Sequence, residues 1–226
     1  MWKKTKDFFT NILYKVIYFF GWCGFRLLFC VGHRYRIHRT DRKKVLKGRK
    51  QGVLIVANHA SFLDPGIVGI IFFHRIWYLA RQSLFENKSF AWLITAVGAL
   101  PISREKLDLA TLRQVKTYIE EGRDVLLFPE GTRTDDGELQ EGQAGVGFFA
   151  DKVKADILPV YVKGSFESWP KSGEYHFAKL DSIVGDLIPY EHWQTLPSGR
   201  ERYQLIANGI MEKLAELKKE LEEIKK

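Results

Sequence analysis

The stretch Val53–Pro65, VLIVANHASFLDP, contains the signals of a strand, a short loop and the start of a helix. Its first five residues are apolar and largely β-branched, which predicts a buried strand over 53–57. Pro65 is favoured at the first helical position, where its missing N–H costs nothing, and Asp64 is a common N-cap. Apolar residues continue over 67–71, so the stretch predicts a strand–loop–helix unit of an α/β protein.

The loop of this unit carries two residues suited to acid–base chemistry, His59 and Asp64. In an α/β sheet, chemistry is usually performed on the loops that follow the carboxyl ends of the strands. A carboxylate reaching back across the loop would hold one ring nitrogen of the histidine and leave the other as a base. No Ser or Cys stands in the position of a nucleophile, so this base would act on a hydroxyl of a substrate. The alternative is a polar surface histidine beside an ordinary helix start.

A second stretch, Val125–Thr134, also places charged residues after an apolar strand, which is predicted over 124–128. Glu130 and Arg133 flank a glycine, and the backbone N–H groups of Gly131 and Thr132 are suited to face an anion. An arginine there favours bidentate recognition of a phosphate or a carboxylate. The alternative is a surface turn with an ordinary Glu–Arg ion pair.

Four blocks of this sequence resemble, in order, the four motifs of the glycerolipid acyltransferases. They are Asn58-His59-x4-Asp64, Gly98 to Arg104, Phe128-Pro129-Glu130-Gly131-Thr132-Arg133, and Leu158-Pro159-Val160 with Gly164. The resemblance spans roughly residues 50–165. Within the superfamily, the chain is most similar to bacterial 1-acylglycerol-3-phosphate acyltransferases. One His-x4-Asp is a weak signal, but four blocks in order are a strong one.

The resemblance implies transfer of a fatty acyl group from acyl carrier protein or CoA to the free hydroxyl of lysophosphatidate, with no cofactor. His59 would be the general base and Asp64 would orient it. The implied substrate-binding residues are Asn58, Arg104, Glu130, Gly131, Thr132, Arg133 and Pro159. Arg104 and Arg133 would bind the acceptor phosphate, Glu130 and Gly131 would shape that pocket, and Pro159 would lie near the acyl site.

Two positions depart from the family pattern. Gln143 stands in the segment before Gly145 where the family usually has lysine, so a phosphate or headgroup contact is lost. Arg81 stands where a lysine is common, which is a milder change. Both changes bear on the choice of acceptor more than on the reaction class.

The N-terminal segment, residues 1–32, is rich in aromatic and aliphatic residues at helical spacing but is interrupted by Lys and Arg. This pattern favours an amphipathic helix, or a short hairpin bent at Gly21 and Gly24, that lies in one leaflet of a membrane. A single spanning helix from about Val16 to Val31 stays open, although it would be barely long enough and would carry Arg26. Residues 33–50 hold nine of the 35 Lys and Arg residues against one acid, Asp41. Such a basic run would face anionic headgroups on the cytoplasmic side. The alternative is a helix packed on its own domain.

The rest of the chain alternates short apolar runs with amphipathic segments. This alternation predicts a mixed, partly parallel sheet flanked by helices in a catalytic domain over 33–226. An edge strand over 34–40 and a further strand over 175–181 are expected. Residues 200–226 form a long amphipathic pattern, which predicts a helix that docks through its first half and ends in solvated turns.

Three other functions were weighed against acyl transfer. A metal-dependent hydrolase built on His59, Asp64 and Glu130 lacks a two-histidine ligand spacing, and Cys23 and Cys30 match no zinc spacing, so no metal is expected. A non-catalytic lipid-binding protein would not need an intact His59 and Asp64. Nucleic-acid binding by the basic run would need interleaved aromatic residues, and only Tyr35 is present there.

Overall fold

The computed structural model describes residues 2–39, 41, 46–72, 74–102, 109–171 and 173–224. Its centre is a seven-stranded sheet with the order β1-β7-β6-β2-β5-β3-β4. The strands are β1 (Arg36–His38), β2 (Leu54–Ala57), β3 (Trp77–Arg81), β4 (Ala99–Ile102), β5 (Val125–Leu127), β6 (Ile157–Lys163) and β7 (Asp181–Val184). Neighbours are parallel except β6 and β7, which are antiparallel. The predicted mixed, partly parallel sheet is therefore confirmed.

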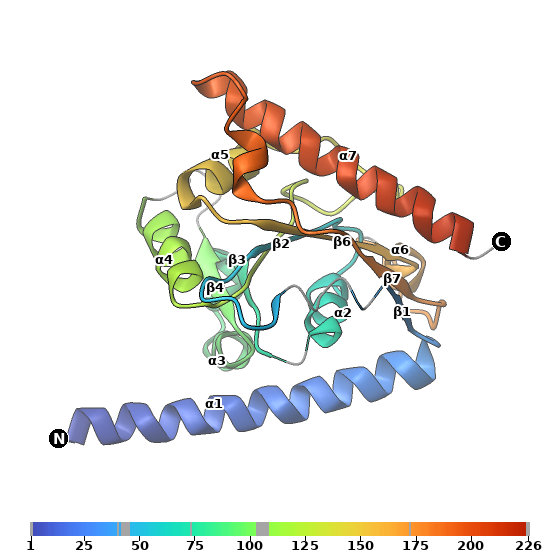
Figure 1. The fold of residues 1–226 in the computed structure, drawn as a ribbon. Coiled ribbons are helices and arrows are strands. Elements are labelled where there is room, and N and C mark those ends of the chain that lie inside the picture. The colour runs from blue at the N-terminus through green and yellow to red at the C-terminus, as the bar shows by residue number, and fades with distance from the viewer. Residues whose placement is uncertain are drawn as a thin grey trace.

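Helices cover both faces of this sheet (Figure 1). They are α1 (Trp2–Leu27), α2 (Asp64–Ile71), α3 (Lys88–Ala96), α4 (Leu109–Glu120), α5 (Ala144–Val153), α6 (Ser165–Ser168) and α7 (Arg200–Ile224). Helices α4, α5 and α7 pack on one face, and α2 packs on the other with the end of α1. Residues of β2 alternate between the two cores: Leu54 and Val56 face α4, α5 and α7, whereas Ile55 and Ala57 face α2. Burial on both faces explains why β2 is a continuous apolar run.

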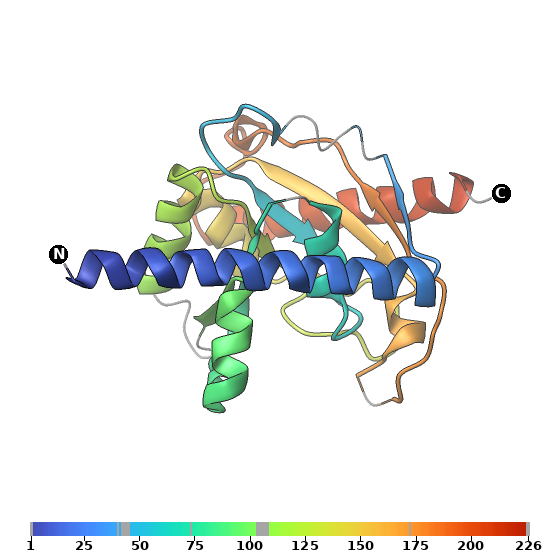
Figure 2. The same ribbon diagram turned by 90° about the horizontal axis from the view of Figure 1, so that it is seen from below.

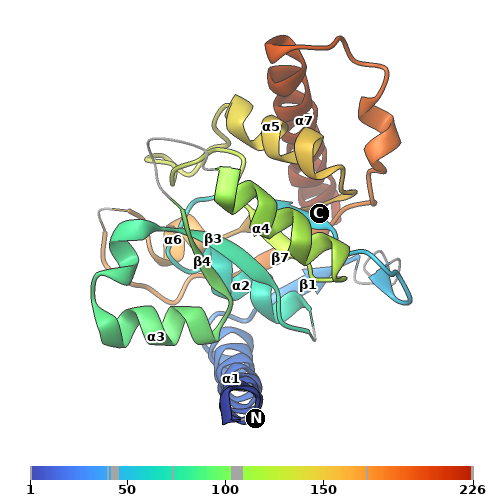
Figure 3. The same ribbon diagram turned by 90° about the vertical axis from the view of Figure 1, so that its left-hand side faces the viewer.

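Helix α1 forms an outer layer beneath α2 and crosses the body over its length (Figures 1 and 2). Seen along its axis in Figure 3, it lies outside the α/β body. Of the two alternatives for this segment, the structure has the helix and not the hairpin bent at Gly21 and Gly24, because α1 is continuous through both residues. An added Cβ at either glycine would meet nothing within 4 Å, so both lie on open sides of the helix. A glycine weakens a helix but keeps its N–H, and so does not interrupt the hydrogen bonds.

None of the described helices has both the length and the apolar character needed to cross a membrane.

Two elements differ from the sequence predictions. The last strand begins at Asp181 rather than Tyr175, because the N–H groups of His176 and Leu180 bond to Ser168 O and His33 O instead of to a strand. Helix α7 docks beyond its first half, since Leu217 and Leu221 are buried with Tyr161 and Ile183 of the sheet. The apolar stripe of α7 continues to Leu221. The many charged residues around it favoured the prediction of solvated turns.

Candidate active site

His59 and Asp64 form a hydrogen-bonded pair at the carboxyl end of β2. The Nδ1 atom of His59 donates to Asp64 Oδ2 over 2.9 Å, and the same oxygen accepts from Ala60 N and Ser61 N at 2.7 Å each. Because a carboxylate holds Nδ1–H, the lone pair lies on Nε2. Nε2 has no hydrogen-bond partner among the described residues, and the side chain is 20% exposed. The arrangement predicted for this pair is present.

Asp64 is not the N-cap that the sequence suggests. The N-cap is Leu63, and Asp64 is the first residue of α2, followed by Pro65. Its carboxylate turns back to the N–H groups of the preceding loop and is fully buried. The side chain therefore closes the 59–64 loop instead of capping the helix, which is what brings it to the histidine ring.

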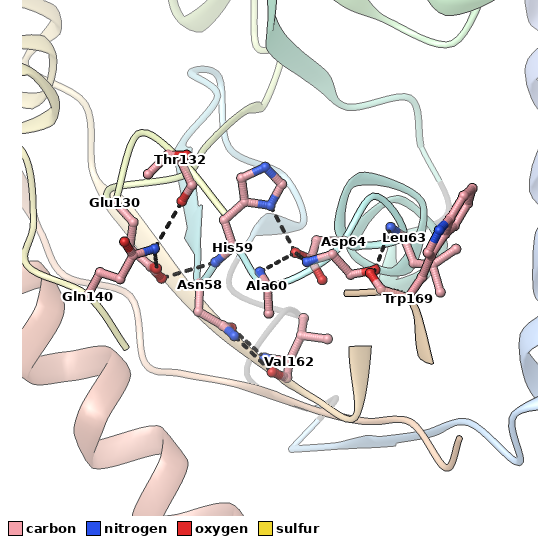
Figure 4. Close-up of polar contacts among 11 residues, drawn as sticks. Asn58, His59, Ala60, Leu63, Asp64, Glu130, Thr132, Gln140, Val162 and Trp169 are labelled. Carbon is pink, nitrogen blue, oxygen red and sulfur yellow. Dashed lines mark hydrogen bonds and ion pairs between the residues drawn. The ribbon is translucent and has the colours of Figure 1, made fainter. Parts of the chain in front are cut away.

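The loop after β5 contacts both the N–H and the carbonyl of His59, and Figure 4 shows the contact with Glu130. Glu130 Oε1 accepts from His59 N at 3.0 Å, and Thr134 N donates to His59 O at 2.9 Å. This contact arises because β5 is the parallel neighbour of β2, so the loops that follow the two strands meet at one edge of the sheet. Phe128 stacks on the imidazole, with ring centroids 4.0 Å apart and planes 16° apart. The orientation of the His59 ring is thus fixed by the hydrogen bond of Nδ1 to Asp64 and by the stacking of Phe128 on one ring face.

The side-chain polar atoms of Glu130 and Asn58 form hydrogen bonds with other residues of the protein. Glu130 is 2% exposed, and its second oxygen accepts from Gln140 Nε2 at 3.0 Å. Burial raises the pKa of Glu130 to about 7. The amide of Asn58 bonds at both ends to Val162 of β6, at 2.9 and 2.8 Å. These bonds hold the loop, and substrate contacts by Asn58 and Glu130 stay predictions.

Arg133 lies beside the histidine loop with an unsatisfied donor. Its Cζ atom is 3.4 Å from the centroid of the Phe62 ring. Its Nη1 atom is buried and has no hydrogen-bond partner among the described residues. Burial and the nearby charge of Arg81, at the end of β3, lower the pKa of Arg133. Two cations held together with a buried free donor form a site that an anion would stabilise.

The remaining predicted site residues lie as follows. Gly131 has φ +70°, a conformation suited to glycine, and Gln143 Cγ would lie 3.2 Å from a Cβ added there. Thr132 offers its carbonyl to Gln140 Nε2 at 3.2 Å. Pro159 is buried in β6 opposite Val56, and it borders Gly185 on the α7 face rather than the ring of His59. Arg104 lies outside the described residues.

The sequence patterns gave no signal for several residues that hold this site. Gln140 lies ten positions after Glu130 in an irregular loop, and Phe62 and Thr134 look like ordinary loop residues. Phe128 stands inside the third motif, but its stacking on His59 depends on strands that meet only in the folded sheet. Within the described ranges, no group of three or more His, Cys, Asp or Glu residues is arranged to hold a metal ion.

An oriented imidazole with a free nitrogen lies at the edge of a mixed sheet, beside an arginine whose Nη1 has no hydrogen-bond partner among the described residues. This arrangement characterises a site for reaction at the hydroxyl of an anionic substrate. The family model described as Acyltransferase matches residues 29–163, which is more than half of the chain. The protein therefore belongs to the acyltransferase family.

Several characterised proteins resemble the chain. The 1-acyl-sn-glycerol-3-phosphate acyltransferase of Bacillus subtilis is 28% identical over 177 residues, which cover 76% of this chain and 84% of the relative. The enzyme of the same name from Helicobacter pylori is 31% identical over 119 residues, covering 50% of this chain and 49% of the relative. The crystal structure of the 1-acyl-sn-glycerophosphate (LPA) acyltransferase PlsC from Thermotoga maritima matches with a TM-score of 0.70 over 96% of this chain and 89% of that one. At 20% identity, this last likeness supports the fold.

Proposed function

We propose that this protein transfers a fatty acyl group from a thioester to the sn-2 hydroxyl of 1-acylglycerol-3-phosphate, giving phosphatidate. The observation that carries the proposal is the His59–Asp64 pair with its free Nε2 beside the unpartnered Nη1 of Arg133. The names of the relatives agree with this choice of reaction.

The reaction requires one base and no covalent enzyme intermediate. The hydroxyl oxygen of the acceptor attacks the thioester carbonyl, and His59 Nε2 takes the proton of that hydroxyl. The tetrahedral intermediate collapses, the C–S bond breaks, and the imidazolium returns the proton to the departing thiolate. The products are the new ester and a free thiol. Asp64 stabilises the imidazolium through Nδ1, as in the general orienting role of such carboxylates.

The acceptor phosphate is assigned to the cationic side of the site. Arg133 supplies the unsatisfied donor, and the nearby charge of Arg81 adds to the attraction. Arg104 is retained as a second phosphate ligand on the resemblance alone. Gln143 lies against Gly131, where the family usually has a lysine nearby, and it supplies no charge. For this reason, the second candidate for the acceptor substrate is another lysolipid.

The donor is proposed to be acyl carrier protein or CoA thioester, and no cofactor is required. Residues 1–32 are proposed to bind the cytoplasmic face of the membrane, and residues 33–226 to form the catalytic domain. Along α1, exposed apolar side chains include Leu13, Val16, Phe19 and Phe20. Another part of α1 is held to the body by Trp22 Nε1, which donates to Phe72 O at 2.9 Å. An exposed aromatic face beside a docked face suits a helix lying in one leaflet.

The test is acyl transfer from a labelled acyl thioester to lysophosphatidate in detergent micelles. His59→Ala is expected to lower kcat by about 10²- to 10⁴-fold, since a general base is removed. His74→Ala is the matched control, because His74 Nε2 also contacts an aspartate, Asp124, at 2.6 Å, but at the amino end of β5. It is expected to retain the activity.

Each alternative has its own outcome in this assay. Substantial turnover by His59→Ala would remove the base assignment. Transfer to another lysolipid, with none to lysophosphatidate, would change the acceptor but keep the reaction. Lipid binding by the wild type without product from any acceptor would favour the non-catalytic lipid-binding protein.

A further inference from the structure

Four aromatic side chains form a connected row that begins on the catalytic loop. These residues, called here the aromatic strip, are Phe62, Trp169, Tyr175 and Phe177. The ring centroids of Phe62 and Trp169 are 5.3 Å apart, those of Trp169 and Tyr175 are 5.8 Å apart, and those of Tyr175 and Phe177 are 5.2 Å apart. The last three members lie just after α6, so the row joins two segments far apart in the sequence.

The two ends of the aromatic strip lie at two different parts of the molecule. At one end, the Phe62 ring carries the guanidinium of Arg133. At the other end, Phe177 packs directly on Gly32, where an added Cβ would lie 2.6 Å from its ring. Gly32 ends the π-helical turn Leu28–Gly32 that follows α1, and its neighbour Val31 is 71% exposed. The strip thus runs from the candidate anion site to the end of the N-terminal helix.

Most of the strip is exposed to solvent, although hydrogen bonds hold two of its members. Phe62 is 54% exposed, Trp169 36% and Phe177 63%. Ser61 Oγ donates to Trp169 O at 2.8 Å, and Tyr175 OH contacts His33 Nε2 at 2.7 Å. A row of exposed rings on a fixed support leaves apolar surface without an internal partner.

We propose that the aromatic strip binds the hydrocarbon chain of the amphiphilic acceptor, with the phosphate on Arg133 and the chain running toward the end of α1. The unpartnered Nη1 of Arg133 marks where the anionic head belongs, and Phe62 contacts that same guanidinium. A chain attached to the head therefore begins at Phe62 and can continue over Trp169. The identity of the acceptor as a lysophospholipid rests on the proposed function, but the head-and-chain geometry does not.

Another exposed apolar surface lies on α3, in an open hollow lined by Lys88, Ser89, Trp92 and Leu93. Helix α3 lies on the other side of α2 from α6 (Figures 1 and 2), so this hollow is separate from the strip. Trp92 is 49% exposed. It provides a matched control: an exposed tryptophan outside the proposed chain site.

The test is binding of alkyl phosphates to the full chain without acyl donor, by calorimetry below the concentration at which micelles form. These probes have no hydroxyl to acylate, so binding is measured without turnover. Butyl phosphate is short enough to reach only Phe62, whereas tetradecyl phosphate is long enough to follow the strip. The wild type is expected to bind the longer probe much more tightly, since each methylene buried on the strip contributes about fourfold.

The variants are Trp169→Ala and Phe177→Ser, with Trp92→Ala as the control. Each strip variant is expected to weaken binding of tetradecyl phosphate about tenfold and to leave butyl phosphate unchanged. Phe177→Ser removes a largely exposed ring, so it tests the proposal even if Trp169→Ala fails to fold. Trp92→Ala is expected to bind both probes as the wild type does.

The proposal would be overturned if the strip variants lost affinity equally for both probes, or lost none for tetradecyl phosphate. Equal losses would mean that the rings merely support the loop that carries Arg133. A loss with Trp92→Ala as large as with the strip variants would show non-specific contact of the chain with exposed rings. If the protein forms no phosphatidate but still binds the longer probe more tightly, the proposed function is rejected. The assignment of the aromatic strip as a hydrocarbon-chain site then stands.

Discussion

The position of the His59 ring depends on single residues that contact its backbone as well as on Asp64. Glu130 accepts from its N–H and Thr134 donates to its carbonyl, so the third motif acts on the first. Gln140 completes this arrangement by donating to Glu130 Oε2 and to Thr132 O. The proposed general base is thus positioned by residues that bond to its backbone, to Glu130 or to Thr132.

Gln140→Leu is expected to lower kcat about tenfold and leave KM for the acceptor nearly unchanged. The substitution removes a donor from the buried carboxylate that accepts from His59 N, which loosens the loop that positions Nε2. The two bonds of Gln140 go to Glu130 and Thr132 and not to the Arg133 side chain, so the effect on acceptor binding is expected to be smaller. Steady-state kinetics across a range of pH would measure the effect, with the exposed Gln114→Leu of α4 as the control. A change confined to KM would assign Gln140 to substrate binding instead.

Glu130 is expected to make stability fall as pH rises. Its pKa is about 7 in the folded state against 4.5 for an ordinary glutamate. Between these values the folded state holds a proton that the unfolded state has released, so the free energy of unfolding decreases with rising pH. The full contribution is at most about 3 kcal/mol, lost by about pH 7.

Urea unfolding of the wild type and Glu130→Gln at about pH 5 and about pH 8 measures this contribution. The variant cannot titrate at position 130, so its stability is expected to fall less over this interval, other groups being common to both proteins. Equal pH dependence in the two proteins would contradict the raised pKa of Glu130.

Among the elements, α7 shows that a charged helix can be docked over nearly its whole length. Leu214 and Leu221 are fully buried, and Leu217 is 5% exposed. The apolar stripe falls on one side of the helix, so abundant Lys and Glu elsewhere do not prevent burial. The prediction of solvated last turns was wrong for Leu221, which is fully buried, whereas Glu222, Glu223 and Ile224 are exposed.

Leu221→Ala is expected to lower the free energy of unfolding by about 2–4 kcal/mol, since it opens a cavity beneath the end of α7. Ile224→Ala is the matched control: this residue lies one turn further and is 42% exposed. It is expected to cost about 0.5 kcal/mol or less. Similar losses in urea unfolding for both variants would indicate that the last turns are not docked as described.

In the whole molecule, the sheet joins the two loops of the site, and α1 lies along one side of the body. Parallel pairing of β2 with β5 joins two loops whose contacting residues, His59 and Glu130, are 71 positions apart. Helix α1 extends beneath the body (Figure 3). Its Phe19 and Phe20 side chains are exposed. Phe29, beyond the end of α1, is fully buried in the core, so deletion of the whole segment would also damage the domain.

The double variant Phe19→Ser, Phe20→Ser is expected to reduce sedimentation with anionic vesicles about tenfold or more, because two rings leave the interface. The melting temperature is expected to change little, since these rings are 60% and 67% exposed. Leu109→Ser on α4 is the control, with a side chain 61% exposed on another part of the surface. Unchanged sedimentation of the double variant would assign membrane binding to another part of the chain.

The local units of this fold follow from the sequence alone. The apolar runs of β2, β5 and β6 and the stripe of α7 are short-range patterns, and burial on both faces of a sheet imposes them directly. The His-x4-Asp spacing likewise predicted the contact between His59 and Asp64, because the two residues share one short loop. The alternation of strands and helices was sufficient to predict a mixed, partly parallel sheet.

Contacts across the sheet were decided by the tertiary structure. The strand order places Glu130 on the backbone of His59, Asn58 on Val162, and Gln140 on Glu130, and no local pattern encodes these pairs. The start of β7, the continuous course of α1 and the row from Phe62 to Phe177 depend in the same way on distant segments. Hydrogen bonds and ring contacts between remote residues form only after the strands have been ordered, which is why periodicity and spacing could not reveal them.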